Sequence, residues 1–228
     1  SELVLITGAN RGLGLGFTTY YLKKGMQVLA TCREPSKAAG LQDLASIYSN
    51  LKIRALDISS EESIQNFVSE ASFSKVDLLI NNAAICSTES FGDWSQSDFL
   101  NSFNVNVIGQ ALLIQALKPF LPNGGKLIQI SSGRGSLSLE RNPTDRLDTY
   151  DISKAALNML TKRLSAKLRP NGISVISLSP GWVQTDMGGK EAPASVSEVI
   201  PVLAEVIAKI NLKESGKFLD ENGEEIPW

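Results

Sequence analysis

The residues best suited to moving a proton in this chain are a tyrosine and a lysine. The 228 residues include no histidine, which excludes Ser-His-Asp and Cys-His catalysis and His-ligated zinc or haem. Tyr150 and Lys154 stand four residues apart and open a helical pattern over Lys154–Leu168, so their side chains share one helix face. A free phenol has a pKa of about 10, and a neighbouring ammonium lowers it. Such a phenol can donate a proton to a carbonyl oxygen as hydride reaches the carbon.

Two further polar positions suit the same chemistry. Ser132 follows the apolar run Lys126–Ile130, so we expect its hydroxyl at the carboxyl edge of a sheet, where it can bond a substrate carbonyl. Asn104 and Asn106 interrupt an apolar helical stretch. Either one of them holds a water in a proton relay, or they are ordinary core amides. By itself, the Tyr-x-x-x-Lys spacing is also compatible with simple surface packing, so its weight depends on the motifs around it.

A glycine-rich segment lies between the first predicted strand and the first predicted helix. Gly8, Gly12 and Gly14 fall within Thr7-Gly8-Ala9-Asn10-Arg11-Gly12-Leu13-Gly14. Glycines allow a tight turn and a close backbone approach to a pyrophosphate, and the free N–H groups of a helix N-terminus attract its charge. The segment therefore predicts a dinucleotide site. The alternative is close strand–helix packing with no ligand.

The end of the second predicted strand indicates which dinucleotide is bound. NAD sites commonly carry a carboxylate there for the ribose 2′-OH, whereas this chain has Thr31-Cys32-Arg33. Arg33 and Arg11 suit a 2′-phosphate, because guanidinium groups form paired, charge-assisted hydrogen bonds with it. We therefore expect NADPH to be preferred over NADH. Alternatively, both arginines are solvated surface charges, with Glu34 and Glu2 as possible partners.

The elements that must position these residues alternate between strand and helix. Short apolar runs predict strands at Leu3–Ile6, Gln27–Thr31, Leu51–Leu56, Val76–Ile80, Lys126–Ile130, Ser174–Leu178 and Lys217–Leu219. This rhythm predicts an α/β fold, a Rossmann-type doubly wound parallel sheet of about seven strands with helices on both faces. We expect one domain over residues 1–228.

Local signals refine the boundaries of these elements. Ser59 with Glu62 and Ser195 with Glu198 have capping-box spacing and predict two helix starts. Leu137–Thr149 and Met187–Ala194 are expected to be loops near the carboxyl ends of strands, where such folds bind their ligands.

Composition excludes several other classes of protein. The net charge of −2 argues against bulk nucleic-acid binding, and the two cysteines, Cys32 and Cys86, are too few for a disulfide scaffold or a Cys-only zinc site. No metal is expected. No apolar segment is long enough to cross a bilayer, and the strand-like run Leu3–Ile6 does not read as a signal peptide. We expect a cytoplasmic protein with reduced thiols.

Taken together, these motifs resemble the short-chain dehydrogenase/reductase family. The runs Asn10–Gly16, Pro180–Gly189 and the ending from Gly216 to Trp228 are similar to those of Sniffer-type carbonyl reductases and bacterial C-factor-like proteins. The residues that match the family's motifs, in chain order, are Thr7, Gly8, Gly12, Gly14, Asn81, Asn82, Ala83, Asn106, Ser132, Tyr150, Lys154, Pro180, Gly181, Val183 and Thr185.

The resemblance implies a role for each of these positions. Tyr150 is the acid/base, Lys154 lowers its pKa and holds the nicotinamide ribose, Ser132 positions the carbonyl, and Asn106 holds the relay water. Asp57 and Ile58 lie beside the adenine, and Asn81 and Ala83 line the adenosine ribose. The nicotinamide end is held by Pro180, Gly181, Val183 and Thr185. In full, the expected cofactor-binding residues are Gly8, Asn10, Arg11, Gly12, Leu13, Arg33, Asp57, Ile58, Asn81, Ala83, Tyr150, Lys154, Pro180, Gly181, Val183 and Thr185.

The leading hypothesis is an NADPH-dependent reductase of aldehydes, ketones or quinones. The alternative is a signalling or regulatory protein that binds the dinucleotide with little or no turnover. A third possibility, an inactive scaffold, fits the intact set of Ser132, Tyr150 and Lys154 less well. The resemblance also implies a homodimer or homotetramer, assembled through the helices that contain Asn106 and Tyr150.

Overall fold

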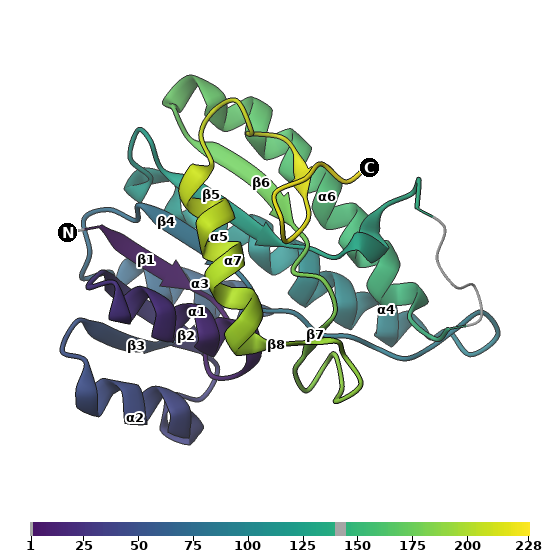
Figure 1. Ribbon diagram of the computed structural model, residues 1–228, viewed down its shortest axis with the longest axis horizontal. Coiled ribbons are helices and arrows are strands. Elements are labelled where there is room, and N and C mark those ends of the chain that lie inside the picture. Colours follow the sequence, from purple (N-terminus) through teal and green to yellow (C-terminus); the bar gives the residue numbers. More distant parts are fainter. Residues whose placement is uncertain (1, 140–144) are drawn as a thin grey trace.

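The computed structural model describes residues 2–139 and 145–228 (Figure 1). Among these residues, seven parallel strands form one sheet in the order β3-β2-β1-β4-β5-β6-β9, which confirms the predicted Rossmann-type fold. The strands are β1 (Leu3–Ile6), β2 (Gln27–Cys32), β3 (Leu51–Ala55), β4 (Leu78–Asn81), β5 (Lys126–Ile130), β6 (Ser174–Leu178) and β9 (Phe218–Leu219).

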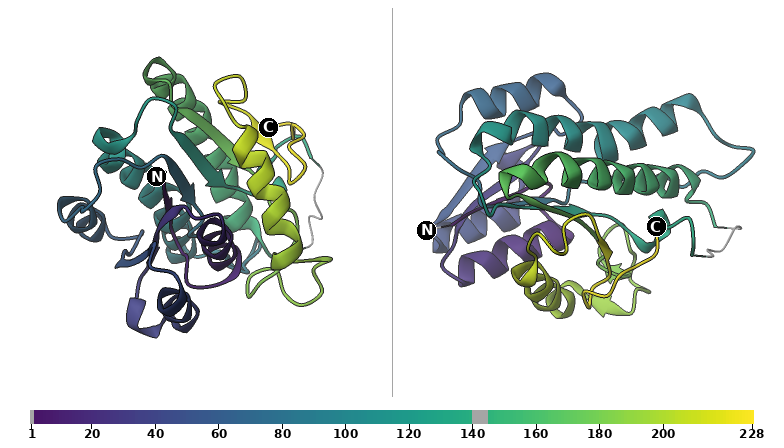
Figure 2. Two further views of the ribbon diagram at one scale, coloured as in Figure 1. Left: turned by 60° about the vertical axis from the view of Figure 1, so that its left-hand side comes forward. Right: turned by 90° about the horizontal axis from the view of Figure 1, so that it is seen from above.

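Helices cover both faces of the sheet (Figure 2). Helices α1 (Gly12–Lys23), α2 (Ala39–Ile47) and α7 (Val196–Lys209) contribute to one apolar core, and α3 (Glu61–Ser69), α5 (Gly109–Leu117) and α6 (Asp148–Leu168) contribute to the other. Successive residues of β1 divide between the two cores: Val4 and Ile6 join the first and Leu5 joins the second. This explains why the strands are apolar on both faces.

The strand order reverses between β1 and β4. From β1 the chain proceeds outward through β2 to β3, and it then crosses to β4 on the other side of β1. In open α/β sheets, a ligand crevice lies at the carboxyl ends of the strands flanking such a switch point. Beyond the same edge, β7 (Val183–Gln184) pairs in parallel with β8 (Ala194–Ser195), and the predicted loop Met187–Ala194 connects them.

Several predicted boundaries differ from the structure. The prediction that Ser59 caps a helix is wrong: α3 is capped by Ser60, whose Oγ accepts from the backbone N–H of Ser63. Ser59 instead donates its own N–H and Oγ to Asp57 Oδ1, at 2.9 and 2.6 Å, and so closes the preceding turn. The second predicted capping box, at Ser195, is confirmed.

The other differences concern strand ends and loops. Strand β2 continues to Cys32, β3 ends at Ala55, β4 continues to Asn81, β9 begins at Phe218, and Ala194 of the predicted loop Met187–Ala194 belongs to β8. Strand β4 begins at Leu78 rather than at Val76, and the helix that contains Tyr150 begins at Asp148. Helix α6 therefore takes the last two residues of the predicted loop Leu137–Thr149, and residues 140–144 of that loop lie outside the described residues. None of the helices in the described ranges has the length and apolar character to span a membrane.

Candidate active site

The glycine-rich turn between β1 and α1 is held by the end of β4. Thr7 Oγ1 accepts hydrogen bonds from the backbone N–H groups of Asn82 and Ala83, both at 3.0 Å. The Asn82 amide donates in return to the carbonyl oxygens of Thr7 and Gly8, at 3.0 and 3.1 Å. The polar Thr7 and Asn82 side chains therefore fix the path of the turn.

The turn has the form of a cradle that side chains would fill. Gly8 and Gly12 adopt φ of 62° and 53°, a left-handed conformation that favours glycine. A Cβ on Gly8 would lie 2.9 Å from Ala83 Cα, and one on Gly14 would overlap the carbonyl oxygen of Gly8. Arg11, which precedes α1, provides no side-chain hydrogen bond to the start of that helix. Free N–H groups at a switch point fit the pyrophosphate of a dinucleotide.

The segment after β6 forms the opposite wall of the cradle. A Cβ on Gly12 would touch Thr185 Cγ2 at 3.4 Å, so Thr185 lies directly beside the glycine turn. Pro180 and Val183 are buried, and Gly181 adopts φ of 75°. The residues predicted for the pyrophosphate and nicotinamide ends thus meet at one edge of the sheet.

The proton-transfer residues lie together at the carboxyl end of β5. Lys154 is 1% exposed, and its Nζ lies 5.5 Å from the centre of the Tyr150 ring and donates to the carbonyl oxygen of Ile130 at 2.8 Å. Tyr150 is also buried, and its phenol lies near enough to Ser132 for that side chain to lower the pKa of the phenol. Ser132 follows β5, and Tyr150 and Lys154 project from one face of α6. The structure therefore brings Ser132, Tyr150 and Lys154 together as predicted.

The electrostatics of Tyr150 differ from the expectation. Burial raises the pKa of the phenol above its ordinary value, more than the Ser132 side chain and the Arg134 guanidinium lower it. The expected lowering of that pKa by Lys154 is not what the structure shows. Burial also lowers the pKa of Lys154, to about 8, which leaves the amine mostly protonated at neutral pH. With its pKa raised, the Tyr150 phenol is protonated at neutral pH and can act as a proton donor.

Asn106 is a buried amide whose side chain is occupied by the protein. Its Oδ1 accepts from the N–H of Ile85, and its Nδ2 donates to the carbonyl oxygen of Ile85 and to Ser153 Oγ, all at 2.9 Å. It lies in the π-helical turn Asn104–Ile108, between α4 (Gln96–Phe103) and α5. The side chain of Asn106 therefore matches the core-amide alternative.

The residues predicted around the adenosine come from two places: two follow β3, and two lie at the end of β4. Asp57 follows β3, and Ile58 beside it is buried in the core. The side chain of Asn81 is buried within the sheet, where it donates to Gln129 Oε1 at 2.8 Å. Ala83 packs against Gly8, as its predicted place near the cofactor requires.

The two arginines of the cofactor prediction are both exposed. Arg11, in the glycine turn, pairs at 2.8 Å with Asp186, in the segment after β7. Arg33 follows β2 on the surface, and Glu34, considered as its partner, pairs with Lys37 instead. Asn10 is exposed and Leu13 is half-buried at the same turn.

Three residues near Tyr150 were not predicted as site residues. From the sequence, Asp151 is expected to point away from the site and Cys86 to be a small buried hydrophobe. Arg134 and Asp151 pair beside the phenol, and burial raises the pKa of the nearby Cys86 thiol to about 11. The position of Asp151 next to Tyr150 was the only available signal, and a helix model places that side chain away from the site. No local pattern indicates Arg134 or Cys86.

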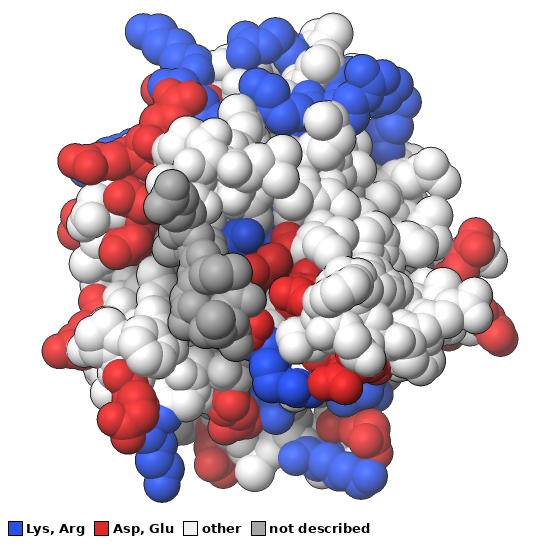
Figure 3. All heavy atoms as spheres, turned by 90° about the vertical axis from the view of Figure 1, so that its right-hand side faces the viewer, with Lys and Arg blue, Asp and Glu red and all other residues white. Residues whose placement is uncertain are grey.

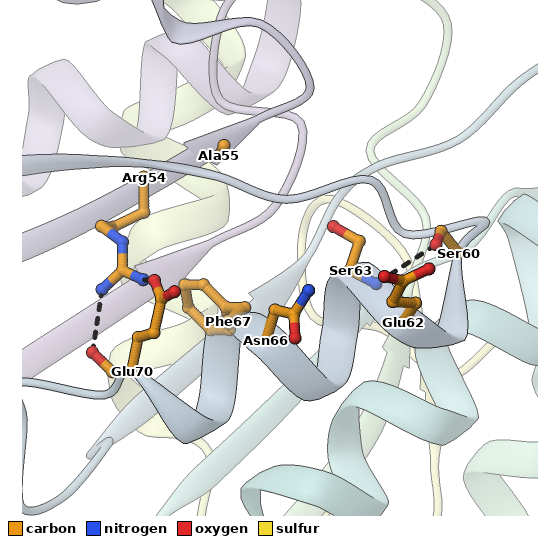
Figure 4. Close-up of a pocket in the computed structure, with 8 residues that line it drawn as sticks. All are labelled: Arg54, Ala55, Ser60, Glu62, Ser63, Asn66, Phe67 and Glu70. Atoms are coloured by element: carbon orange, nitrogen blue, oxygen red, sulfur yellow. Dashed lines mark hydrogen bonds and ion pairs between the residues drawn. The ribbon is translucent and has the colours of Figure 1, made fainter.

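A separate hollow lies beside β3, the strand at one edge of the sheet. This cavity of about 370 Å³ is formed by β3 and α3, and Arg54 crosses it to Glu70 (Figure 4). Its lining residues are Arg54, Ala55, Ser60, Glu62, Ser63, Asn66, Phe67 and Glu70. None of these belongs to the site at the ends of β1, β4 and β5.

Comparison with known proteins agrees with this geometry. Residues 2–195 match the family model described as short chain dehydrogenase. The chain belongs to the short-chain dehydrogenase family. It is 37% identical over 156 residues to C-signal of Myxococcus xanthus, an alignment that covers 67% of this chain and 93% of that protein. It is also 33% identical to the short chain dehydrogenase gsfK of Penicillium aethiopicum, covering 99% and 98% of the two chains.

Solved structures show the same similarity across the whole fold. The NADPH-bound carbonyl reductase from chicken fatty liver superposes with a TM-score of 0.93 at 36% identity, covering 100% of this chain and 99% of that one. The carbonyl reductase Sniffer of D. melanogaster also has a TM-score of 0.93, at 30% identity and the same coverage. This short-chain dehydrogenase therefore has an oxidoreductase fold that binds a nicotinamide dinucleotide.

Proposed function

We propose that this short-chain dehydrogenase reduces a carbonyl group of an aldehyde, ketone or quinone to an alcohol, with NADPH as the hydride donor. The observation that carries the proposal is the contact between Ser132 and the buried Tyr150 phenol, with the Lys154 ammonium on the same helix face. A neutral phenol next to a second hydroxyl can stabilise a developing alkoxide and then protonate it. The carbonyl reductase relatives support the same reaction class.

The chain's own residues divide the work in this mechanism. When bound, a nicotinamide dinucleotide would supply the hydride. The N–H groups at the start of α1 and the turn around Gly12 would hold its pyrophosphate, and Thr185 lies beside that turn. Ser132 donates a hydrogen bond to the carbonyl oxygen, and Tyr150 Oη gives that oxygen its proton. Lys154 stands behind the phenol, anchored on the carbonyl of Ile130, and is placed to hold the nicotinamide ribose.

Oxidation of NADPH in the presence of a carbonyl panel tests this mechanism. We expect Tyr150→Phe and Lys154→Ala to lower kcat by about 10²-fold or more, since general acid catalysis contributes about 10²–10⁴-fold. Tyr48→Phe serves as the matched control, because Tyr48 lies at the end of α2, outside the site. Full turnover by Tyr150→Phe would refute the proposal.

NADPH preference rests on Arg33 and Arg11, two exposed cations flanking the cradle. The NADPH-bound relative from chicken liver supports this choice. We expect Arg33→Ala to weaken NADPH binding by about tenfold and to leave NADH binding unchanged, because a hydrogen bond to a charged group contributes about 1.5–3 kcal/mol. Lys37→Ala is the control, since this exposed lysine pairs with Glu34. Equal binding of the two dinucleotides by the unmodified protein would contradict the preference.

The similarity to C-signal favours one competing function, a regulatory protein that binds the dinucleotide with little or no turnover. Calorimetric binding of NADPH together with the absence of turnover on every carbonyl would support that alternative. Turnover lost in both Tyr150→Phe and Lys154→Ala supports the enzyme.

We also propose that the whole chain acts as one domain that self-associates through the helices around α6. Exposed apolar side chains on this side of the molecule support the assembly; they are Leu100, Ile108, Ile152 and Met159. Light scattering on Met159→Glu should show a smaller particle than the unmodified protein. A monomeric mass for the unmodified protein would exclude the assembly.

A further inference from the structure

Arg134 connects the two hydroxyl groups of the candidate active site. Its backbone N–H donates to Ser132 Oγ at 3.2 Å. Its side chain forms a two-pronged contact with Asp151, the residue after Tyr150: Nε donates to Oδ1 at 2.6 Å and Nη2 to Oδ2 at 2.8 Å. One residue therefore orients the serine through its main chain and holds the first turn of α6 through its side chain.

The surroundings of Arg134 favour a fixed geometry. A third contact runs from Nη2 to Asp145 Oδ1 at 2.7 Å, and the three side chains are only 22%, 29% and 25% exposed for Arg134, Asp145 and Asp151. Figure 3 shows basic and acidic side chains meeting inside a hollow on this face of the molecule. Partly buried, bidentate Arg–carboxylate pairs are more rigid than exposed monodentate ones.

The first turn of α6 has no side-chain cap of its own, so the contact between Arg134 and Asp151 is one of the few that hold it. Leu147, which precedes the helix, provides no side-chain hydrogen bond to it. Farther along, Asn158 anchors the same connection through its contacts with Ser131 Oγ and the carbonyl oxygen of Gly135, at 2.7 and 3.2 Å. Asn158 therefore holds the segment after β5 against α6 without Arg134. Arg134 holds that segment to Asp151, the residue next to Tyr150.

We propose that Arg134 is a positioning residue, which sets the relative placement of Ser132 and Tyr150 by clamping the turn Gly133–Gly135 to Asp151. This inference rests on the proposed carbonyl reduction. It predicts an effect on the chemical step and little effect on cofactor binding, because the hydrogen bonds of Arg134 are with Ser132, Asp145 and Asp151 and none is with the glycine turn. A misplacement of about 1 Å costs about 10²-fold in rate.

Four variants separate positioning from general stability. Arg134→Met removes the contact with Asp151. Arg134→Lys keeps the positive charge but cannot form the two-pronged hydrogen bond, and Asp151→Asn removes the negative charge of the partner. Arg146→Met is the matched control: Arg146 pairs with Asp93 at a similar distance, 2.7 Å, but both side chains are more than half exposed. Steady-state kinetics, NADPH binding and thermal unfolding are measured for each variant and for the Arg134→Met/Asp151→Asn double variant.

We expect Arg134→Met and Asp151→Asn each to lower kcat by about 10- to 100-fold, with KM for the carbonyl and the NADPH affinity within about threefold of the unmodified values. The double variant should lose no more than the worse single variant, because both changes break one contact. Arg134→Lys should lose kcat with little change in thermal stability, which keeps the test valid if Arg134→Met fails to fold. Near-normal kcat in Arg134→Lys, multiplied losses in the double variant, or an equal loss in Arg146→Met would each overturn the proposal.

Hydrogen exchange distinguishes failure of the positioning role of Arg134 from failure of the proposed carbonyl reduction. If the unmodified protein turns over no carbonyl, the proposed reaction is wrong, but the clamp remains measurable in the cofactor-free protein. Amides in the first turn of α6 should then exchange faster in Arg134→Lys and unchanged in Arg146→Met. Equal exchange in both variants would refute the clamp.

Discussion

The two sides of this site are held together by different means. The cofactor side, where β1 meets α1, is held by backbone packing at glycines and by hydrogen bonds between the main chain and the Thr7 and Asn82 side chains. The substrate side, where β5 meets α6, is held by contacts between side chains: Arg134 with Asp151 and Asp145, and Trp94 with Asp148.

This difference indicates that the backbone of the cofactor side tolerates little change, whereas the side chains of the substrate side can be exchanged. A cradle defined by the backbone fits the shared part of a dinucleotide, and it tolerates few substitutions because no Cβ fits there. A wall built from side-chain pairs and exposed apolar residues can be rebuilt without disturbing the sheet. Two loops on the substrate side each expose a large apolar residue, Phe91 in one and Leu137 in the other.

The largest expected effect concerns the cofactor side. We expect Gly14→Ala to lower the free energy of unfolding by more than about 3 kcal/mol, since the added Cβ would overlap the Gly8 carbonyl oxygen, which cannot move freely. Helix propensity alone predicts the opposite sign, a gain of about 1 kcal/mol. Urea unfolding, with NADPH binding measured on the folded fraction, distinguishes a loss of stability through steric overlap from a gain through helix propensity.

Gly16→Ala in the same helix is the control for this prediction. Its added Cβ meets only the side chains of Val196 and Ile200, which can shift. We expect a clearly smaller loss of stability than for Gly14→Ala. Equal losses would show that the backbone contact is not what makes the cradle intolerant.

The sequence predicts the cofactor side well because local patterns encode it. Glycines between an apolar strand and a helix are visible as a motif, and the alternation of apolar runs yields seven strands whose core residues match the structure. Tyr150 and Lys154 were predictable for the same reason, since their spacing of four residues is a property of one helix.

The substrate side was mostly not predictable, because its contacts join distant residues. Arg134 and Asp151 are 17 positions apart, and Trp94 and Asp148 are 54 positions apart. Asn106 was predicted at the site, but only the structure shows its amide bound to Ile85 and Ser153. The raised pKa of Tyr150 was also hidden, because it depends on burial rather than on the nearby lysine.

The next effect in size concerns the buried charge of Lys154, between the two sides. Burial lowers its pKa from an ordinary 10.5 to about 8, so from pH 8 to 10.5 the unfolded chain binds more protons at this group than the folded one. Stability from this group is therefore present above pH 10.5 and lost as the pH falls towards 8. We expect the free energy of unfolding to rise on the order of 3 kcal/mol across that window.

Urea unfolding of the unmodified protein and of Lys154→Met between pH 8 and pH 10 measures this contribution. The difference in stability between the two should change with pH in favour of the unmodified protein. Measurement stops at pH 10 because the raised pKa of Tyr150 acts with the opposite sign above it. A pH-independent difference would show that Lys154 keeps an ordinary pKa despite its burial.

The smallest expected effect concerns Asp148 on the substrate side. Its Oδ2 accepts from the backbone N–H of Phe91 at 2.9 Å and from Trp94 Nε1 at 3.1 Å, so it fixes the segment between β4 and α4. Asp148→Ala should cost about 1–2 kcal/mol of stability and alter the fluorescence of Trp94. It should also change KM for the carbonyl while NADPH binding stays constant, because Asp148 touches nothing in the glycine cradle. If Asp148→Ala lowers the affinity for NADPH as well as changing KM for the carbonyl, the two sides are coupled. The independence that we infer from their different construction is then wrong.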